Sequence, residues 1–192
     1  MKKVKLAIFA SGSGTNAENM IRYFSNHPRV KVSLIVSNNP AAYVLERARR
    51  HNIPSVVMDR DFRRSEEKVM ELLTSYGIDF IVLAGYMLLL PAWLIQHYPR
   101  RIVNIHPALL PAYGGKGMYG EHVHHAVIDA GEPRSGITIH FVNERYDEGD
   151  IIFQAQCPVM PQDTPESLAE KVHKLEYEHY PRVVEEIIEG LA

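Results

Sequence analysis

An amide and an imidazole, Asn104 and His106, are the side chains best spaced for chemistry in this sequence. They alternate with Val103 and Ile105, so an extended backbone places the polar pair on one face and the apolar pair on the other. Pro107 cannot donate to a sheet ladder and disfavours a helical residue before it, so we expect a strand that ends at His106. Such a pair suits stabilisation of the oxyanion that forms when a nucleophile adds to a carbonyl. The alternative is a strand end whose polar side chains only satisfy loop backbone groups.

A glycine-rich turn follows the first expected strand, at residues 4–10, and precedes a helix expected at 17–24. The backbone N–H groups of such a turn and the positive end of the helix can face an anion. The spacing matches neither G-x-G-x-x-G nor the lysine-containing P-loop, so it favours a single phosphate over a dinucleotide or a triphosphate. A turn needed only for chain geometry is the alternative. The turn consists of Gly12, Ser13, Gly14, Thr15 and Asn16.

Strands and helices alternate along most of the chain. Further strands are expected at residues 30–37, 55–58 and 79–84 and up to residue 106, and helices at 41–51, 65–76 and 93–98. This alternation predicts an α/β fold with a Rossmann-like, doubly wound, mostly parallel sheet. Residues 136–142 and 151–159 are expected to form a C-terminal antiparallel hairpin. A long final helix is expected from residues 163–165, with a break around Pro181 and a continuation to Gly190.

Composition limits the classes of function. The 192 residues are 46% hydrophobic, which suits one core, and we expect a single domain over residues 1–192. Lysine and arginine (21) nearly balance aspartate and glutamate (23), so no basic field favours nucleic acid. The only cysteine, Cys157, excludes an internal disulfide and any multi-cysteine metal site, so we expect a reducing, cytoplasmic setting. Every apolar run is shorter than the roughly 20 residues that cross a bilayer.

Two loops are candidates for binding. Residues 85–91 follow the 79–84 strand and are rich in leucine, which suits core packing or the wall of a pocket for a flat aromatic ligand. Residues 112–123 hold four glycines, so this loop is expected to be mobile and close to the site. His122, His124 and His125 lie in it or at the start of the next helix, but no acidic or cysteine cluster accompanies them, and we predict no metal.

Three stretches then occur in one order: A-S-G-S-G-T-N after the first strand, V-L-A-G-Y-M before the central strand, and N-I-H-P-A-L-L-P with Y-D-E-G-D beyond it. With them the chain resembles the phosphoribosylglycinamide formyltransferases, folate-dependent enzymes of purine biosynthesis in the formyl-folate transferase family. The resemblance covers residues 4–181. N-I-H-P with L-L-P is shared with methionyl-tRNA formyltransferases and formyltetrahydrofolate hydrolases, whereas S-G-S-G-T-N in a chain of this length is more specific.

The resemblance implies transfer of the formyl group of 10-formyltetrahydrofolate, a co-substrate, to the amine of glycinamide ribonucleotide, without a metal. It implies a catalytic trio of Asn104, His106 and Asp147. Asp147 is then expected to orient His106 and to raise its pKa, so that the imidazolium and Asn104 donate to the oxyanion. The nucleotide-binding residues it implies are Gly12, Ser13, Gly14, Thr15, Asn16, His173 and Glu176. The folate-binding residues it implies are Arg64, Met87, Leu88, Leu89, Leu90, Asn104 and Asn143.

The chain differs from that family at two places. Leu88 stands where some members have arginine, and the loop at residues 113–121 is longer and richer in glycine than the family's short Pro-Gly turn. We expect a monomer or a weak homodimer that binds neither nucleic acid nor a membrane. Three alternatives remain: a formyltetrahydrofolate hydrolase, a formyltransferase acting on another amine such as that of a nucleotide sugar, and a non-enzymatic domain that binds a phosphorylated metabolite.

Overall fold

The computed structural model describes residues 3–191 of the chain, and a single seven-stranded sheet runs through this part, in the order β3-β2-β1-β4-β5-β6-β7. Strands β1 to β5 pair in parallel, whereas β6 pairs antiparallel with both β5 and β7. The strands are β1 (Val4–Phe9), β2 (Val30–Ser37), β3 (Ser55–Val57), β4 (Phe80–Leu83), β5 (Ile102–His106), β6 (Arg134–Phe141) and β7 (Ile151–Pro158). The predicted Rossmann-like sheet and its antiparallel C-terminal hairpin are confirmed.

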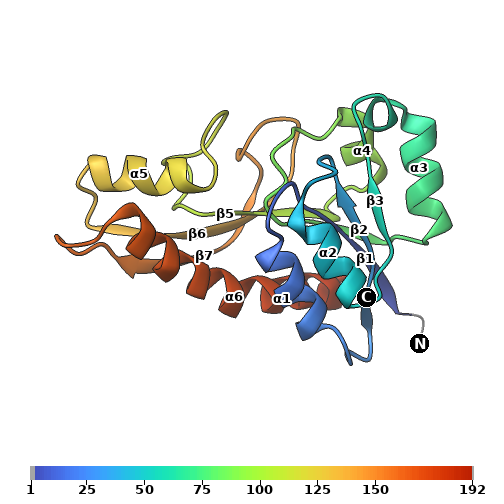
Figure 1. Ribbon diagram of the computed structural model, residues 1–192, viewed down its shortest axis with the longest axis horizontal. Helices are drawn as coiled ribbons and strands as arrows, with labels where there is room; N and C mark the ends of the chain where they lie inside the picture. Colours follow the sequence, from blue (N-terminus) through green and yellow to red (C-terminus); the bar gives the residue numbers. More distant parts are fainter. Residues whose placement is uncertain (1–2, 192) are drawn as a thin grey trace.

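Helices cover both faces of this sheet (Figure 1). The first face carries α1 (Thr15–Tyr23), α2 (Tyr43–Arg50), α5 (Glu121–Asp129) and α6 (Pro165–Gly190). The second carries α3 (Glu66–Ser75), α4 (Ala92–His97) and the short 3-10 helix η1 (Phe62–Arg64). Strand β1 contributes to the hydrophobic core on both faces of the sheet because its side chains alternate. Leu6 and Ile8 pack into the core of the first face, and Ala7 and Phe9 pack into that of the second. Between residues 3 and 191, no helix is long and apolar enough to span a membrane.

The loops that follow β1 and β4 are brought together by the strand order. β1 pairs with β2 on one side and with β4 on the other, so the chain leaves these neighbouring strands in different directions and opens a crevice at their carboxyl ends. Two hydrogen bonds join the loops there. The N–H of Ser11 donates to the carbonyl of Gly85 at 3.0 Å, and the N–H of Met87 donates to the Ser11 hydroxyl at 3.0 Å. The glycine turn and the leucine-rich loop therefore form one wall.

The antiparallel pairing of β6 with β5 adds a second set of polar side chains beside Asn104 and His106. The register pairs Asn104 with His140 and His106 with Thr138. Directly paired residues lie on the same face of a sheet, so His140 is held next to Asn104. The expected end of β5 at His106 is confirmed.

The final helix does not break at Pro181, contrary to expectation, because α6 runs without interruption from Pro165 to Gly190. A proline inside a helix removes the N–H that would bond the carbonyl four residues earlier, here that of Tyr177. That carbonyl accepts instead from the side-chain amide of Asn19 in α1, at 2.9 Å. Figure 1 shows α1 lying beside α6, which allows this substitution. The neighbouring helix thus satisfies the group that proline leaves without a partner.

Candidate active site

A cleft of about 580 Å³ opens where the glycine turn, the loop after β4 and the end of β5 meet. Most side chains that the sequence nominated line this single cleft. They are Gly12, Ser13, Gly14, Thr15, Asn16, Met87, Leu88, Leu89, Leu90, Asn104, His106, Asp147, His173 and Glu176. Two nominated residues do not. Arg64 ends η1, outside the cleft lining, and the Asn143 side chain accepts the N–H of Arg145 at 3.0 Å, which holds the β6–β7 turn instead.

His106 sits at the bottom of the cleft with only 3% of its surface exposed. Its Nε2 lies 2.7 Å from the carbonyl oxygen of Tyr113. A carbonyl oxygen only accepts, so Nε2 carries a hydrogen in this arrangement. Its Nδ1 lies 3.5 Å from Oδ2 of Asp147, and that oxygen also accepts the N–H of Gly115 at 3.0 Å. The ring is therefore oriented between a backbone carbonyl and a carboxylate.

The pKa of His106 is lowered from its ordinary value, and burial is the largest cause. Asp147 and the Tyr113 carbonyl both raise this pKa, but burial and the neighbouring His140 outweigh them. Asp147 raises the pKa as expected, but the net shift is downward and disfavours the protonated His106 that we expected. The reason is that β5 and the loop above it remove the imidazole from water, which disfavours its charged form.

Asn104 is held by His140, a histidine of β6 that the sequence did not assign to the site. Its amide Nδ2 lies 3.2 Å from Nε2 of His140 and 3.4 Å from Oδ1 of Asp147. His140 Nδ1 lies 2.9 Å from the carbonyl of Phe141, so Nδ1 carries a hydrogen and, in that tautomer, Nε2 can accept from the Asn104 amide. Both amide hydrogens of Asn104 therefore face acceptors, and the contact at 3.4 Å is the weaker of the two.

Asp147 remains ionised although it is largely buried. Burial raises its pKa, but the neighbouring His140, the His106 ring and the N–H of Gly115 outweigh burial, and the pKa is lowered overall. Asp147 has a φ of 56°, a left-handed conformation that aspartate and asparagine tolerate better than most residues. The carboxylate is thus a fixed negative charge between two imidazoles.

The glycine turn presents backbone donors to the cleft. Gly14 has a φ of 73° and caps the start of α1 without a side-chain hydrogen bond. In the part of the chain from residue 3 to 191, no protein acceptor takes the N–H groups of residues 12–16. The first turn of α1 points the same way, so these N–H groups and the helix end can meet an anion together.

A buried carboxylate lies beside this turn. The Asn16 amide donates to Glu176 of α6 at 2.8 Å, and Asn16 Oδ1 is buried without a hydrogen-bond partner among the described residues. Burial raises the pKa of Glu176, while the Asn16 hydrogen bond lowers it. A carboxyl group and an amide oxygen that line a cleft suit hydroxyl groups, which can donate to both.

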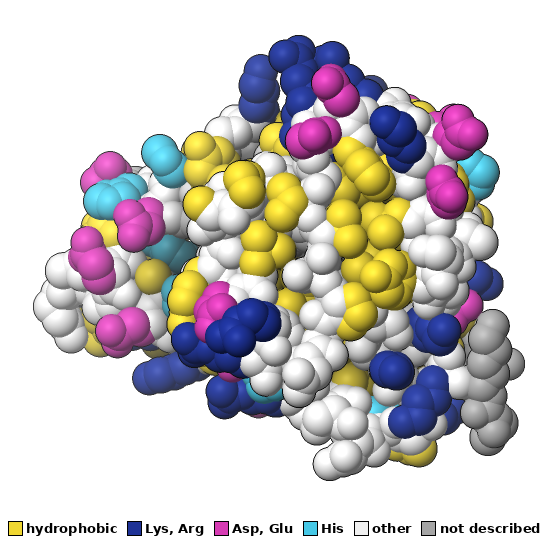
Figure 2. All heavy atoms as spheres, turned by 45° about the vertical axis from the view of Figure 1, so that its right-hand side comes forward, with side chains coloured by type: hydrophobic (Ala, Val, Ile, Leu, Met, Phe, Trp, Pro, Cys, Tyr) yellow, Lys and Arg dark blue, Asp and Glu magenta, His cyan; other side chains and the backbone are white. Residues whose placement is uncertain are grey.

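The opposite wall is apolar. Met87 and Leu89 line the cleft with 48% and 44% of their surfaces exposed, and Tyr119 faces it from the glycine-rich loop. Figure 2 shows hydrophobic side chains gathered in the middle of one face, with charged side chains around them. Leu88 also lines the cleft, so this position contributes no charge to it. This wall suits a flat aromatic ring.

Four further polar side chains line the cleft without having been assigned to it from the sequence: Lys116, His124, Arg145 and Tyr146. Burial and nearby histidines lower the pKa of His124 to about 4, so it is neutral at ordinary pH. Lys116 lies within the glycine-rich loop, whose proximity to the site was expected. Within residues 3–191, no group of three or more histidine, cysteine, aspartate or glutamate side chains is placed to hold a metal ion.

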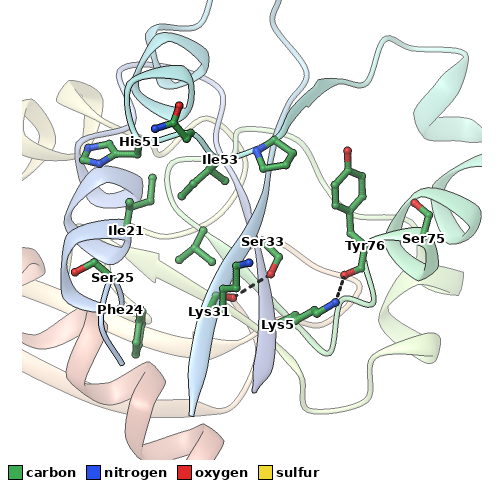
Figure 3. A pocket seen from close by; sticks show the side chains of 13 residues that line it. Lys5, Ile21, Phe24, Ser25, Lys31, Ser33, His51, Ile53, Ser75 and Tyr76 are labelled. Atoms are coloured by element: carbon green, nitrogen blue, oxygen red, sulfur yellow. Dashed lines mark hydrogen bonds between the residues drawn. The ribbon is translucent and has the colours of Figure 1, made fainter. Parts of the chain in front are cut away.

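A second hollow, of about 470 Å³, lies at the amino ends of the strands (Figure 3). Polar groups along its wall already bond within the protein. Lys5 Nζ donates to the carbonyl of Tyr76 at 3.2 Å, and the Ser33 hydroxyl donates to the carbonyl of Lys31 at 3.4 Å. His51 of the same wall lies 3.1 Å from Glu18. Without a paired acid and base, this hollow offers no comparable chemistry.

Comparison with known proteins is consistent with the location of this cleft. The family model described as formyl transferase matches residues 4–184, nearly the whole chain. The chain belongs to the formyl transferase family. The C-terminal limit of the match falls within α6, so the matched part of this formyl transferase includes every residue that lines the cleft.

Several of its relatives in the family are named phosphoribosylglycinamide formyltransferase. The phosphoribosylglycinamide formyltransferase of Haemophilus influenzae is 37% identical and covers 97% of this chain and 88% of its own length. The chloroplastic one of Arabidopsis thaliana is 44% identical over 98% of this chain, which spans 66% of that relative, just under two thirds. The crystal structure of phosphoribosylglycinamide formyltransferase from Bacillus halodurans has a TM-score of 0.86 at 39% identity and covers 96% of this chain and 95% of its own.

Gly14 offers a direct test of the turn in this formyl transferase. A Cβ there would lie 2.4 Å from Cγ2 and 2.9 Å from Cα of Val44, at a φ that valine rarely adopts. Gly14→Val should therefore push the turn away from α2 and displace its N–H groups. We expect a rise of about tenfold or more in KM for a phosphorylated substrate, with little change in folate affinity. Steady-state KM values for both substrates test this, and an equal loss for both, or none, would indicate a merely structural turn.

Proposed function

We propose that the chain is a phosphoribosylglycinamide formyltransferase, formed as one domain over residues 1–192. It transfers the formyl group of 10-formyltetrahydrofolate to the amine of glycinamide ribonucleotide in purine biosynthesis. One observation carries the proposal: a single cleft is lined by an anion-binding turn, by Asn104, His106 and Asp147, and by an apolar wall. The shared name of the relatives supports the substrate pair.

The two substrates would occupy different parts of this cleft. The phosphate of the nucleotide would accept from the free N–H groups of residues 12–16 and face the positive end of α1. Its ribose hydroxyls would donate to Glu176 and to the unpartnered Asn16 Oδ1. The flat ring of the folate would lie against residues 85–90. Side-by-side binding would supply much of the rate through proximity.

The reaction joins the substrate amine to the formyl carbon, and the oxygen of the tetrahedral intermediate becomes negative. Asn104 would donate to this oxygen with the hydrogen that now makes its weaker contact, at 3.4 Å to Asp147. The amine then loses a proton, the bond from the formyl carbon to the folate nitrogen breaks, and that nitrogen gains a proton, with water as relay. No covalent enzyme intermediate is needed.

His106 would donate to the same oxygen through Nε2. That hydrogen now bonds to the Tyr113 carbonyl. Catalysis would therefore require this hydrogen bond to break, through a shift of the loop at residues 113–120. Asp147 beside Nδ1 favours a proton there and opposes the effect of burial on the His106 pKa. The imidazolium would then be the form that stabilises the oxyanion.

We propose a monomer or weak homodimer whose partners are the two small substrates, working in a reducing compartment such as the cytoplasm. The near balance of charges and the single cysteine support this.

The deciding experiment is an assay of formyl transfer from 10-formyltetrahydrofolate to glycinamide ribonucleotide. We expect formylated nucleotide to accumulate only when both substrates are present. A parallel reaction without nucleotide tests the hydrolase alternative, because a hydrolase would release formate in it at an undiminished rate. A third reaction, with an amino nucleotide sugar in place of glycinamide ribonucleotide, tests the alternative of a formyltransferase that acts on another amine. Formate release without nucleotide, or transfer only to the sugar, would reject the proposed substrate pair.

A further inference from the structure

Helix α2 reaches under the glycine turn and holds two successive carbonyl groups. The N–H of Val44 donates to the carbonyl of Gly12 at 3.1 Å, and the Nε of Arg47 donates to the carbonyl of Ser13 at 2.8 Å. Both carbonyls therefore point away from the cleft. Because these two oxygens are bonded to α2, neither carbonyl faces a bound anion. The N–H groups of the turn are left to face it.

Arg47 is itself fixed from two further directions. Its Nη1 forms an ion pair with Glu18 in the first turn of α1, and its guanidinium carbon lies 5.0 Å from the centroid of the Tyr43 ring. The side chains of Arg47 and Glu18 are only 19% and 17% exposed. Glu18 is held in turn by Arg22 at 3.0 Å and His51 at 3.1 Å. A planar guanidinium can donate in two fixed directions at once, which a lysine ammonium on a flexible stem does less well.

The ion pair between Arg47 and Glu18 also affects the charge near the glycine turn. A carboxylate in the first turn of a helix uses the same positive helix end that a bound phosphate would use, and it repels the phosphate as a like charge. The ion pair with Arg47 neutralises that carboxylate. Loss of Arg47 would therefore free the Ser13 carbonyl and leave only Arg22 and His51 to offset the negative charge of Glu18 near the phosphate.

We propose that Arg47 is a positioning residue for the nucleotide phosphate, acting through the Ser13 carbonyl and through Glu18 without touching the substrate. This inference rests on the proposed function, because the anion is taken to be the phosphate of the nucleotide. It concerns a side chain that does not line the cleft. We expect removal of the Arg47 side chain to weaken nucleotide binding and to leave folate binding and turnover unchanged.

The test compares Arg47→Ala with Arg49→Ala. Arg49 lies on the same helix, is 75% exposed and pairs with Glu46 instead of the turn. We expect Arg47→Ala to raise KM for glycinamide ribonucleotide by about tenfold or more, equivalent to about 1.4 kcal/mol, with kcat and the folate KM within about twofold. Arg49→Ala should match the parent. Calorimetric Kd values for the nucleotide should follow the KM values.

Two further variants separate the two actions of Arg47. Glu18→Gln in the Arg47→Ala background should recover part of the nucleotide affinity, because it removes the repulsion but leaves the Ser13 carbonyl free. Arg47→Lys should lie between parent and alanine variant. Two results would overturn the inference: an unchanged nucleotide KM in Arg47→Ala, or an equal rise in both substrate KM values accompanied by a lower Tm, which would mean a general structural role.

The same variants remain informative if the parent fails to formylate the nucleotide, a result that rejects the proposed function alone. Inorganic phosphate is then the probe, titrated into parent, Arg47→Ala and Arg49→Ala by calorimetry. Weaker phosphate binding in Arg47→Ala only would support the positioning role of Arg47. Equal phosphate binding in all three, or none in any, would overturn it.

Discussion

Replacing His106 with alanine is expected to lower kcat for formyl transfer by about 100-fold or more, which is the usual effect of removing one oxyanion donor. Both substrates should still bind, because the groups assigned to the phosphate and to the folate ring lie on other loops. The side chain is almost completely buried at the end of β5, so its Nε2 hydrogen is held at a fixed point that a mobile water would not reproduce as well. Single-turnover kinetics and calorimetry on the same sample give the two measurements.

His97→Ala is the matched control for this variant. His97 ends α4, pairs with Glu66 at 2.9 Å and is partly exposed, so its loss removes an imidazole without touching the cleft. Its turnover should remain at the parental value. If His106→Ala no longer bound either substrate, the residue would have a binding or structural role, and the oxyanion assignment would be wrong.

Asp147→Asn is expected to cause the second large loss, because it removes a negative charge at nearly constant shape. Asparagine also tolerates the φ of 56° at this position, so the backbone should be unaffected. Asp147 raises the His106 pKa against the effect of burial, and without its charge that pKa should fall further. We expect kcat/KM at pH 7 to drop by about tenfold or more, with partial recovery as the pH is lowered and His106 regains its proton.

An NMR titration of His106 in parent and Asp147→Asn checks the cause directly. The midpoint should move to lower pH in the variant. Asp150→Asn is the control, since Asp150 is 80% exposed and pairs with Arg100 outside the cleft. An unchanged His106 midpoint, or activity at pH 7 within about twofold of the parent (~0.4 kcal/mol in barrier), would place the carboxylate in another role.

Local pattern was sufficient to predict the parallel half of the fold. β2 begins and ends at the expected residues, and β5 ends at His106 because Pro107 stops the ladder. The sequence also placed the glycine turn and the leucine-rich loop directly after strands, whereas the neighbouring position of β1 and β4 is seen only in the sheet order.

Contacts between distant segments explain what the sequence could not predict. His140 joins Asn104 only because β6 pairs antiparallel with β5, and nothing in either strand alone specifies that partner or register. Pro181 should end a helix by its own chemistry, but Asn19 of α1 bonds the carbonyl that it leaves free. The net pKa of His106 depends on burial, which only the assembled loops determine.

The hydrogen bond between Asn16 and Glu176 joins the first helix to the last across 160 positions of sequence. During synthesis the glycine turn is made early, but the carboxylate that completes its surroundings arrives only with α6. An N-terminal fragment therefore cannot form the proposed ribose site, however well β1 to β4 pair within it. The order in which a ribosome releases the chain thus delays the nucleotide site until nearly all of the sheet is in place.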